Sequence, residues 1–271
     1  MQRDFKAAEK VIDRALALSP QSFSLWALKS QLAFQETGDL SVAEEGFADF
    51  DQARASGKLR EIDPAALAEV TLAKANVLTL QKKYPEALAL LRQIPRETRA
   101  GKAHELKEVD LLEGIALEGM GQKEAAQAAF RRAKEEAEAI LREAPNDAPR
   151  HASLGRMLAW LGEKDAAIAE AKRAVELLPA SVDAFSGPQM QKALAEVYAL
   201  TGENAQAIAL LDELLSRPSD VTVAALKLDP AMRRLRDDPE FQKPLAKRGR
   251  SLKGERWMDL RLTIRQHPGR G

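Results

Sequence analysis

The 271-residue sequence contains no cysteine, which excludes disulfide bonds and thiolate metal sites. Aromatic residues are also scarce, at 5% of the chain, although 45% of the residues are hydrophobic. Much of this apolar content is alanine and leucine, which favour helices, whereas strands favour β-branched and aromatic residues. The composition therefore predicts a helical protein with a substantial core.

The chain has no excess of charge, because 41 lysines and arginines balance 41 acidic residues. A neutral chain has no global field that attracts nucleic acid, an anionic membrane or an acidic ligand. No apolar run approaches the about 18 residues that cross a bilayer, so no membrane insertion is expected. The N-terminus lacks the features of a signal peptide, which predicts a cytoplasmic location. The alternative is a periplasmic location, if the chain belongs to a larger membrane-anchored protein.

An internal repeat is visible when the chain is aligned on its turn residues. These are Arg3, Gly38, Lys82, Gly121, Gly162 and Gly202. Five residues after each comes an alanine: Ala8, Ala43, Ala87, Ala126, Ala167 and Ala207. Apolar residues follow nine and twelve residues after each turn, and these three offsets share one helical face. The repeat predicts a second helix after each turn, with alanine at the closest helix–helix approach and glycine ending the preceding helix.

A stretch with helical periodicity also precedes each later turn, over residues 22–38, 63–83, 102–121, 149–165 and 189–203. Prolines close the second helices, since proline cannot continue a helix: Pro20, Pro95, Pro145, Pro179 and Pro218. Residues 131–147 contain no breaker before Pro145 and should lengthen their helix by about two turns. Each unit therefore reads as a helix, a tight turn, a helix and a proline-marked loop.

This pattern resembles the tetratricopeptide repeat, most closely in "LGRMLAWLGEKDAAIAEAKRAVELLP" and "LAEVYALTGENAQAIALLDELLSRP". These stretches carry the family's leucine and small residue (Leu154-Gly155 and Leu194-Ala195), followed by its large residue (Leu158 and Tyr198). The resemblance implies an all-α fold, a right-handed superhelical solenoid of antiparallel helix pairs. It covers residues 1–218, as a half repeat over 1–20 and five helix pairs. The turns are 35, 44, 39, 41 and 40 residues apart, so the superhelix should be less regular than that of an ideal array.

Two further segments follow the repeats. Residues 219–245 contain Asp229-Pro230 and Asp238-Pro239, each typical of an N-cap with proline at the first helical position. We expect two short helices that cap the array. The segment resembles the end of repeat arrays in bacterial regulators with an upstream kinase, winged-helix or cyclase domain. Residues 246–271 have eight basic and two acidic residues and are predicted to form a flexible, solvated tail.

No pattern indicates catalysis. His104, His151 and His267 lie far apart without metal-ligand spacing, and partial burial of His151 is expected rather than metal binding. The sequence has no phosphate-binding loop, nucleophile elbow or HExxH motif. We therefore expect no enzymatic activity, no cofactor and no metal site.

The concave face of such an array is the candidate binding surface, because the first helices line it. On the family's pattern the groove-facing residues include Asn76, Glu118, Arg156, Lys192 and Glu196. An asparagine amide can hold a peptide backbone, and arginine or lysine can hold a carboxylate. The leading hypothesis is a protein–protein interaction scaffold that binds a peptide or helical segment in this groove.

Two alternatives follow from the chain ends. The first residues look like a second helix without its first, with Ala8, Ile12 and Ala15 only partly covered by the next repeat. This start favours the C-terminal sensory or docking portion of a larger bacterial signalling or transcriptional regulator. The same face could pair with a second copy, giving a homodimer. A weaker alternative is nucleic-acid association through the basic tail.

Overall fold

The computed structural model describes residues 5–19, 22–38, 40–57, 62–95, 108–217, 219 and 221–247. These residues form helices and no strand, which confirms the all-α fold class. The elements are α1 (Phe5–Leu18), α2 (Phe23–Thr37), α3 (Ser41–Ala55), α4 (Pro64–Leu80), α5 (Tyr84–Leu91), α7 (Val109–Gly119), α8 (Lys123–Glu143), α9 (Ala148–Leu161), α10 (Lys164–Leu177), α11 (Gly187–Thr201), α12 (Asn204–Ser216), α13 (Val223–Leu228) and the 3-10 helix η2 (Pro230–Arg234). A last helix covers 239–247. None of the described helices combines the length and apolar character that crossing a membrane requires.

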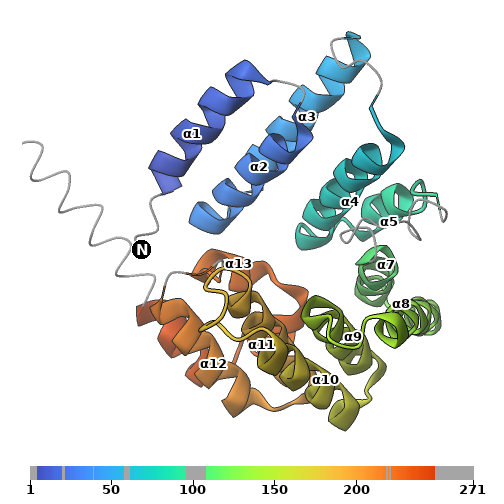
Figure 1. The fold of residues 1–271 in the computed structure, drawn as a ribbon, viewed down its shortest axis with the longest axis vertical. Coiled ribbons are helices and arrows are strands. Elements are labelled where there is room, and N and C mark those ends of the chain that lie inside the picture. Colours follow the sequence, from blue (N-terminus) through green and yellow to red (C-terminus); the bar gives the residue numbers. More distant parts are fainter. Residues whose placement is uncertain are drawn as a thin grey trace, which may run out of the picture.

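The helices pack in sequential pairs, each joined by a tight turn (Figure 1). The pairs are α2 with α3, α4 with α5, α7 with α8, α9 with α10, and α11 with α12. Neighbouring pairs also contact each other, since α9 packs on both α8 and α11. The first helix, α1, packs on α2. As a result Ile12 is buried, and the large apolar side chains that α1 exposes are those of Val11 and Leu18.

The turns within the pairs share one backbone conformation. Gly38, Gly121, Gly162 and Gly202 have φ values of 73°, 75°, 81° and 84°. This left-handed region is open to glycine, whereas a Cβ crowds the following carbonyl oxygen. In the turn between α4 and α5, Lys82 takes the same conformation at φ 62°. A lysine is thus held where the other four turns have glycine.

Replacing this lysine with glycine is expected to stabilise the protein. The strain at a left-handed non-glycine residue is about 1–2 kcal/mol, and the greater freedom of glycine in the unfolded chain offsets part of it. We expect Lys82→Gly to raise the free energy of unfolding by about 0.5–1 kcal/mol, measured by urea denaturation. Lys82→Ala is the control, because alanine keeps the Cβ and should change stability by less than about 0.5 kcal/mol. A glycine variant less stable than the alanine variant would contradict the assignment.

Small residues let the two helices of a pair approach closely. The alanines five residues after the turns in the described pairs are at most 1% exposed: Ala43, Ala87, Ala126, Ala167 and Ala207. Opposite them, a Cβ added to Gly155 of α9 would lie 3.0 Å from the carbonyl oxygen of Ala167 and 3.1 Å from the Cβ of Ala171. Because protein interiors are close-packed, a larger side chain at this position would push α9 and α10 apart.

The helix boundaries follow the sequence signals closely. The long helix predicted before Pro145 is confirmed, since α8 has 21 residues and ends at Glu143. α4 starts at Pro64, and Asp63 occupies its N-cap position without a side-chain capping hydrogen bond. The predictions for Arg3, Pro20, Pro218, residues 102–107 and the tail beyond residue 247 lie outside the described residues.

The C-terminal segment contains both predicted short helices. Asp229 accepts a hydrogen bond from the backbone N–H of Ala231 at 2.9 Å and starts η2. Asp238 accepts one from the backbone N–H of Glu240, also at 2.9 Å, and starts the last helix. The helix α13, which the sequence did not predict, precedes them. Its residue Leu226 is buried in one core cluster with side chains of α11, α12, η2 and the last helix.

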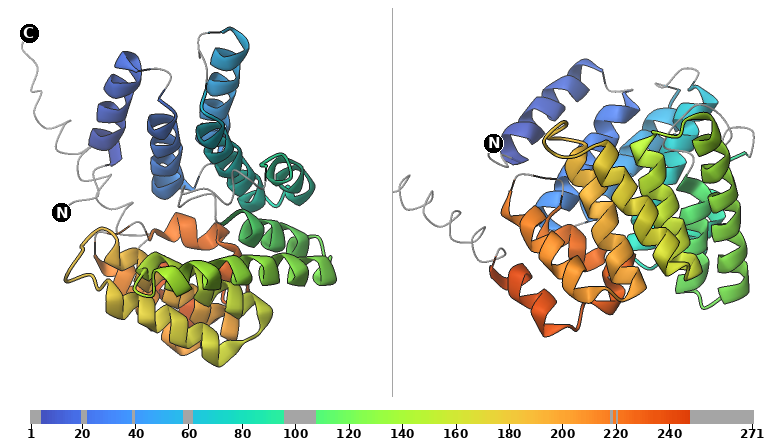
Figure 2. Two further views of the ribbon diagram at one scale, coloured as in Figure 1. Left: turned by 45° about the vertical axis from the view of Figure 1, so that its right-hand side comes forward. Right: turned by 60° about the horizontal axis from the view of Figure 1, so that its bottom comes forward.

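The same segment extends from α11 to the N-terminal helices. η2 packs on α11, and α13 packs on α2. The contact with α2 is close, because a Cβ added to Gly38 would lie 3.1 Å from the Cβ of Ala224. Figure 2 shows α13 and η2 between the N-terminal helices and the later pairs. The C-terminal segment therefore joins the first helix pair to the last, in addition to covering the end of the helix array.

Candidate functional site

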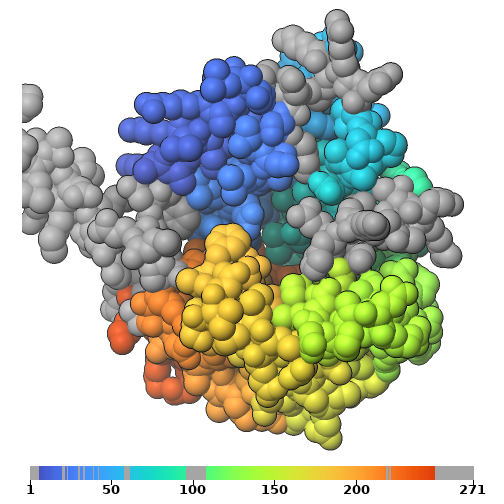
Figure 3. Space-filling view, viewed as in Figure 1, coloured from blue at the N-terminus to red at the C-terminus, as the bar shows by residue number. Residues whose placement is uncertain are grey.

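A cavity of about 520 Å³ lies among the first helices of the pairs. Its described lining residues come from α2, α4, α7 with the adjoining Glu108, α9 and α11, and from the C-terminal segment. The second helices of the pairs contribute none of these lining residues. The space-filling view shows the molecule hollowed between the blue N-terminal helices and the yellow and green later pairs (Figure 3). We call this space the inner cavity.

Much of the inner cavity is apolar. Its apolar lining side chains include Phe34, Leu72, Leu111, Ile115, Trp160 and Leu200. Trp160 is held in place by Phe130 of α8, whose ring stacks on it with centroids 5.5 Å apart. Phe130 in turn fills the space beside Gly114, where an added Cβ would lie 2.3 Å from the phenyl ring. The aromatic part of the wall therefore rests on the pair formed by α7 and α8.

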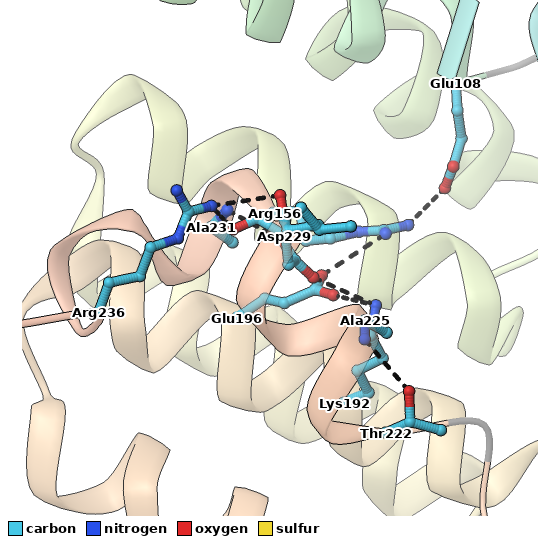
Figure 4. Close-up of polar contacts among 10 residues, drawn as sticks. Glu108, Arg156, Lys192, Glu196, Thr222, Ala225, Asp229, Ala231 and Arg236 are labelled. Carbon is cyan, nitrogen blue, oxygen red and sulfur yellow. Dashed lines mark hydrogen bonds and ion pairs between the residues drawn. The ribbon is translucent and has the colours of Figure 1, made fainter. Parts of the chain in front are cut away.

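Charged side chains gather on the remaining part of the wall (Figure 4). The Lys192 ammonium lies 2.6 Å from the Glu196 carboxylate, one turn further along α11, and 3.4 Å from the Asp229 carboxylate. The Arg156 guanidinium of α9 lies 3.6 Å from Glu196 and donates a hydrogen bond to Glu108. We call these five residues the charged cluster. Its members come from α9, α11, the residue before α7 and the residue that caps η2.

The pKa values of Glu196 and Asp229, the buried and the partly buried carboxyl beside Lys192, are shifted in opposite directions. Burial alone would raise the pKa of Glu196, but Lys192 and Arg156 outweigh it and lower this pKa. Burial raises the pKa of Asp229, and the neighbouring Glu196 carboxylate raises it further. A hydrogen bond joins the two carboxyls. Glu196 is therefore the more readily ionised of the two carboxyls.

The two cations are held in their charged forms. Burial opposes the charge on Lys192, but Glu196 and Asp229 outweigh it and raise the lysine pKa. The pKa of Arg156 is also raised, because Glu108 and Glu196 outweigh the effect of burial. Both cations are thus neutralised by carboxylates of their own chain. A ligand carboxylate would have to compete with these internal partners.

Four of the five groove candidates lie on the wall of the inner cavity: Asn76, Arg156, Lys192 and Glu196. The fifth, Glu118, is not among the described lining residues. Its carboxylate lies 3.8 Å from the Arg233 guanidinium of η2. The repeat register thus placed four side chains on one surface, although they are separated by up to 120 residues (196 − 76) in the sequence.

Two members of the charged cluster were not identified from the sequence. Asp229 was interpreted only as a helix cap, a role that it also has. Glu108 had no periodic signal, because it directly precedes α7. Nothing local marks either residue, since Glu108 meets Arg156 across 48 positions of the chain.

In the described part of the chain, no group of three or more His, Asp or Glu side chains is arranged so that it could hold a metal ion. His151 is partly buried, as expected. Its Nδ1 lies 2.5 Å from the Glu170 carboxylate and its Nε2 lies 3.0 Å from the carbonyl oxygen of Pro145. The inner cavity can therefore offer an apolar wall, an amide on Asn76 and a cluster rich in carboxylates.

No model of a known protein family and no curated protein sequence matches the chain.

Proposed function

We propose that the chain is a non-catalytic interaction module, a tetratricopeptide-like solenoid that binds a short peptide segment in the inner cavity. The observation that carries this proposal is the composition of the wall. Apart from Glu108 and the C-terminal segment, the described lining residues come from first helices. This is the surface that stacked helix pairs present to extended ligands.

The size of the inner cavity favours an extended peptide over a helical segment, the two ligands that the sequence suggested. Sites that enclose small ligands have volumes of about 300–1,000 Å³, and the inner cavity measures about 520 Å³. A helix about 10 Å wide and three turns long occupies more than about 1,000 Å³. A helical segment is therefore too large while α13 and η2 are in place. A few residues of an extended peptide fit.

The lining chemistry suits such a segment. An extended peptide exposes backbone N–H and C=O groups, which an asparagine amide can pair with from both sides. Asn76 is exposed on the wall formed by α4 and is available for this role. Leu72 of α4 and Ile115 of α7, which also line the cavity, would receive an apolar side chain. The proposed ligand is thus a segment with at least one apolar residue.

Peptide display tests this function. A library of short random peptides would be selected on the full chain, and the dissociation constants of enriched peptides measured by calorimetry. Asn76→Trp should weaken binding at least about tenfold, because the indole fills the cavity, a loss of about 1.4 kcal/mol. Asn146→Trp is the matched control, since Asn146 is exposed in the loop between α8 and α9. Failure to enrich any peptide, or equal binding by both variants, would overturn the proposal.

The other functional expectations stay predictions. The described residues do not test three of them: an upstream effector domain, a homodimer, and nucleic-acid binding through the tail. The cytoplasmic location is likewise a prediction.

A further inference from the structure

The wall of the inner cavity carries more acid than base. Three carboxyls of the charged cluster, Glu108, Glu196 and Asp229, surround the two cations Arg156 and Lys192. Glu69 of α4 adds a fourth carboxyl to the wall. An incoming anion would meet carboxylates that already hold both cations. An incoming cation would meet the excess acid and would favour ionisation of Asp229.

A segment of matching composition lies in the same chain. Residues 248–271 contain seven arginines or lysines and two acids, a net charge of +5 (7 − 2). Because the whole chain is neutral, residues 1–247 carry −5 (0 − 5). The segment is not uniformly polar, since Trp257, Leu260, Leu262 and Ile264 alternate with or adjoin its charged residues. It therefore offers the cationic and apolar groups that the charged cluster and the apolar wall complement.

We propose that residues 248–271 dock in the inner cavity of their own chain, with arginine side chains against the charged cluster and Trp257 against the apolar wall. This inference rests on the proposed function, because it names an occupant of the same cavity. The docked segment is an internal competitor of any partner peptide. A partner must displace it, so the tail sets the affinity that a partner needs.

The chain is long enough for this contact. Phe241 and Leu245 of the last helix belong to the core cluster that also contains residues of α11 and η2, two elements of the cavity wall. The tail thus follows a helix that packs in the same core as two elements of the cavity wall. Trp257 lies ten positions after Lys247 (257 − 247), a stretch that reaches up to about 33 Å when extended. A compact chain of this size has a radius of gyration of about 18 Å, so the inner cavity lies within reach.

The absence of cysteine allows a direct test in the full chain. Lys227→Cys on the exposed side of α13 and Thr263→Cys in the tail introduce the only two thiols, which carry spin labels. Pulsed electron paramagnetic resonance then measures the distance between the labels. The expected result is one narrow, short distance at low salt. Loss of this distance in about 1 M salt is also expected, because the screening length falls to about 3 Å.

Variants of the tail test whether its positive charge is what holds it in the inner cavity. Changing Arg256, Arg261 and Arg265 together to glutamine should abolish the narrow distance, whereas changing them to lysine should retain it. Asn76→Trp should abolish it by filling the inner cavity, and Asn146→Trp should not. A broad distribution in the unaltered tail, or a narrow one that survives Asn76→Trp, would overturn the docking. Loss of the narrow distance on dilution with unlabelled chain would show exchange between copies and overturn the intramolecular assignment.

The two proposals fail in different ways. If the tail does not dock but selected peptides still discriminate Asn76→Trp from Asn146→Trp, only the internal occupant is wrong. If no peptide binds even when the three tail arginines are changed to glutamine, the proposed function is wrong.

Discussion

Replacing Phe130 with alanine is expected to lower the free energy of unfolding by about 3–5 kcal/mol. The ring is fully buried, stacks on Trp160 and fills the space that Gly114 leaves open on α7. Alanine would remove the buried area and leave a cavity, since three helices meet at this ring and cannot all collapse onto it. This loss is a large part of the about 5–15 kcal/mol that stabilises a typical domain.

Phe185→Ala provides a control with the same chemical change. Phe185 is 80% exposed in the loop before α11, so its truncation should alter stability by less than about 0.5 kcal/mol. Urea denaturation followed by circular dichroism measures both variants. Phe130→Leu keeps most of the volume and should cost less than about 1.5 kcal/mol, which provides a folded variant if alanine abolishes folding. Equal stability of the Phe130→Ala and Phe185→Ala variants would contradict the packing at the junction of α7, α8 and α9.

Local signals explain why the helices could be predicted. The position of α9 and α10 depends on Gly155, Gly162 and Ala167, which lie within one unit of the repeat and act through contacts between adjacent helices. The spacing of the repeat predicted the turn at Lys82 even though this residue is not a glycine, and Lys82 does adopt the conformation of the turn glycines. Short-range steric requirements of this kind leave a mark in the sequence.

The C-terminal segment shows where such signals end. The six residues of α13 are too few for a clear helical period, and α13 contacts α2 across 186 positions of the chain (224 − 38). The charged cluster depends on this contact, since Asp229 follows α13 directly. Periodicity could place Arg156, Lys192 and Glu196 on inward faces, with Lys192 and Glu196 one turn apart. It could not show that Glu108 and Asp229 would join them, because these contacts connect distant parts of the chain.

Replacing Glu196 with glutamine is expected to lower the free energy of unfolding by about 2–4 kcal/mol at neutral pH. Removing one partner of a buried ion pair typically costs about 3–5 kcal/mol, since the other charge is left buried without compensation. Glu196 serves two cations, Lys192 at 2.6 Å and Arg156 at 3.6 Å, and only 6% of its side chain is exposed. The cost is reduced because Asp229 stays 3.4 Å from Lys192 and loses the neighbouring negative charge that raises its own pKa, so its carboxylate can still compensate the lysine.

Glu118→Gln is the matched control for this change. Its partner Arg233 is 3.8 Å away and has 58% of its side chain exposed, so the loss should be below about 1 kcal/mol. Urea denaturation of both variants at pH 7 gives the comparison. A loss in Glu118→Gln as large as that in Glu196→Gln would mean that the charged cluster has no special role in stability.

The pH dependence of the stability difference tests whether the charge of Glu196 causes the loss of stability in Glu196→Gln. The folded-state pKa of Glu196 lies below its ordinary value of about 4.3, so its contribution is complete above that pH and is lost as the pH falls through the folded value. Asp229 has the opposite sign: its pKa is raised, so its ionisation with rising pH destabilises the folded state. The stability difference between the wild type and Glu196→Gln should therefore be largest near pH 7 and shrink below about pH 4. There a protonated glutamate resembles glutamine. A difference that stays constant from pH 7 to pH 3 would assign the effect to packing rather than to the charge of Glu196.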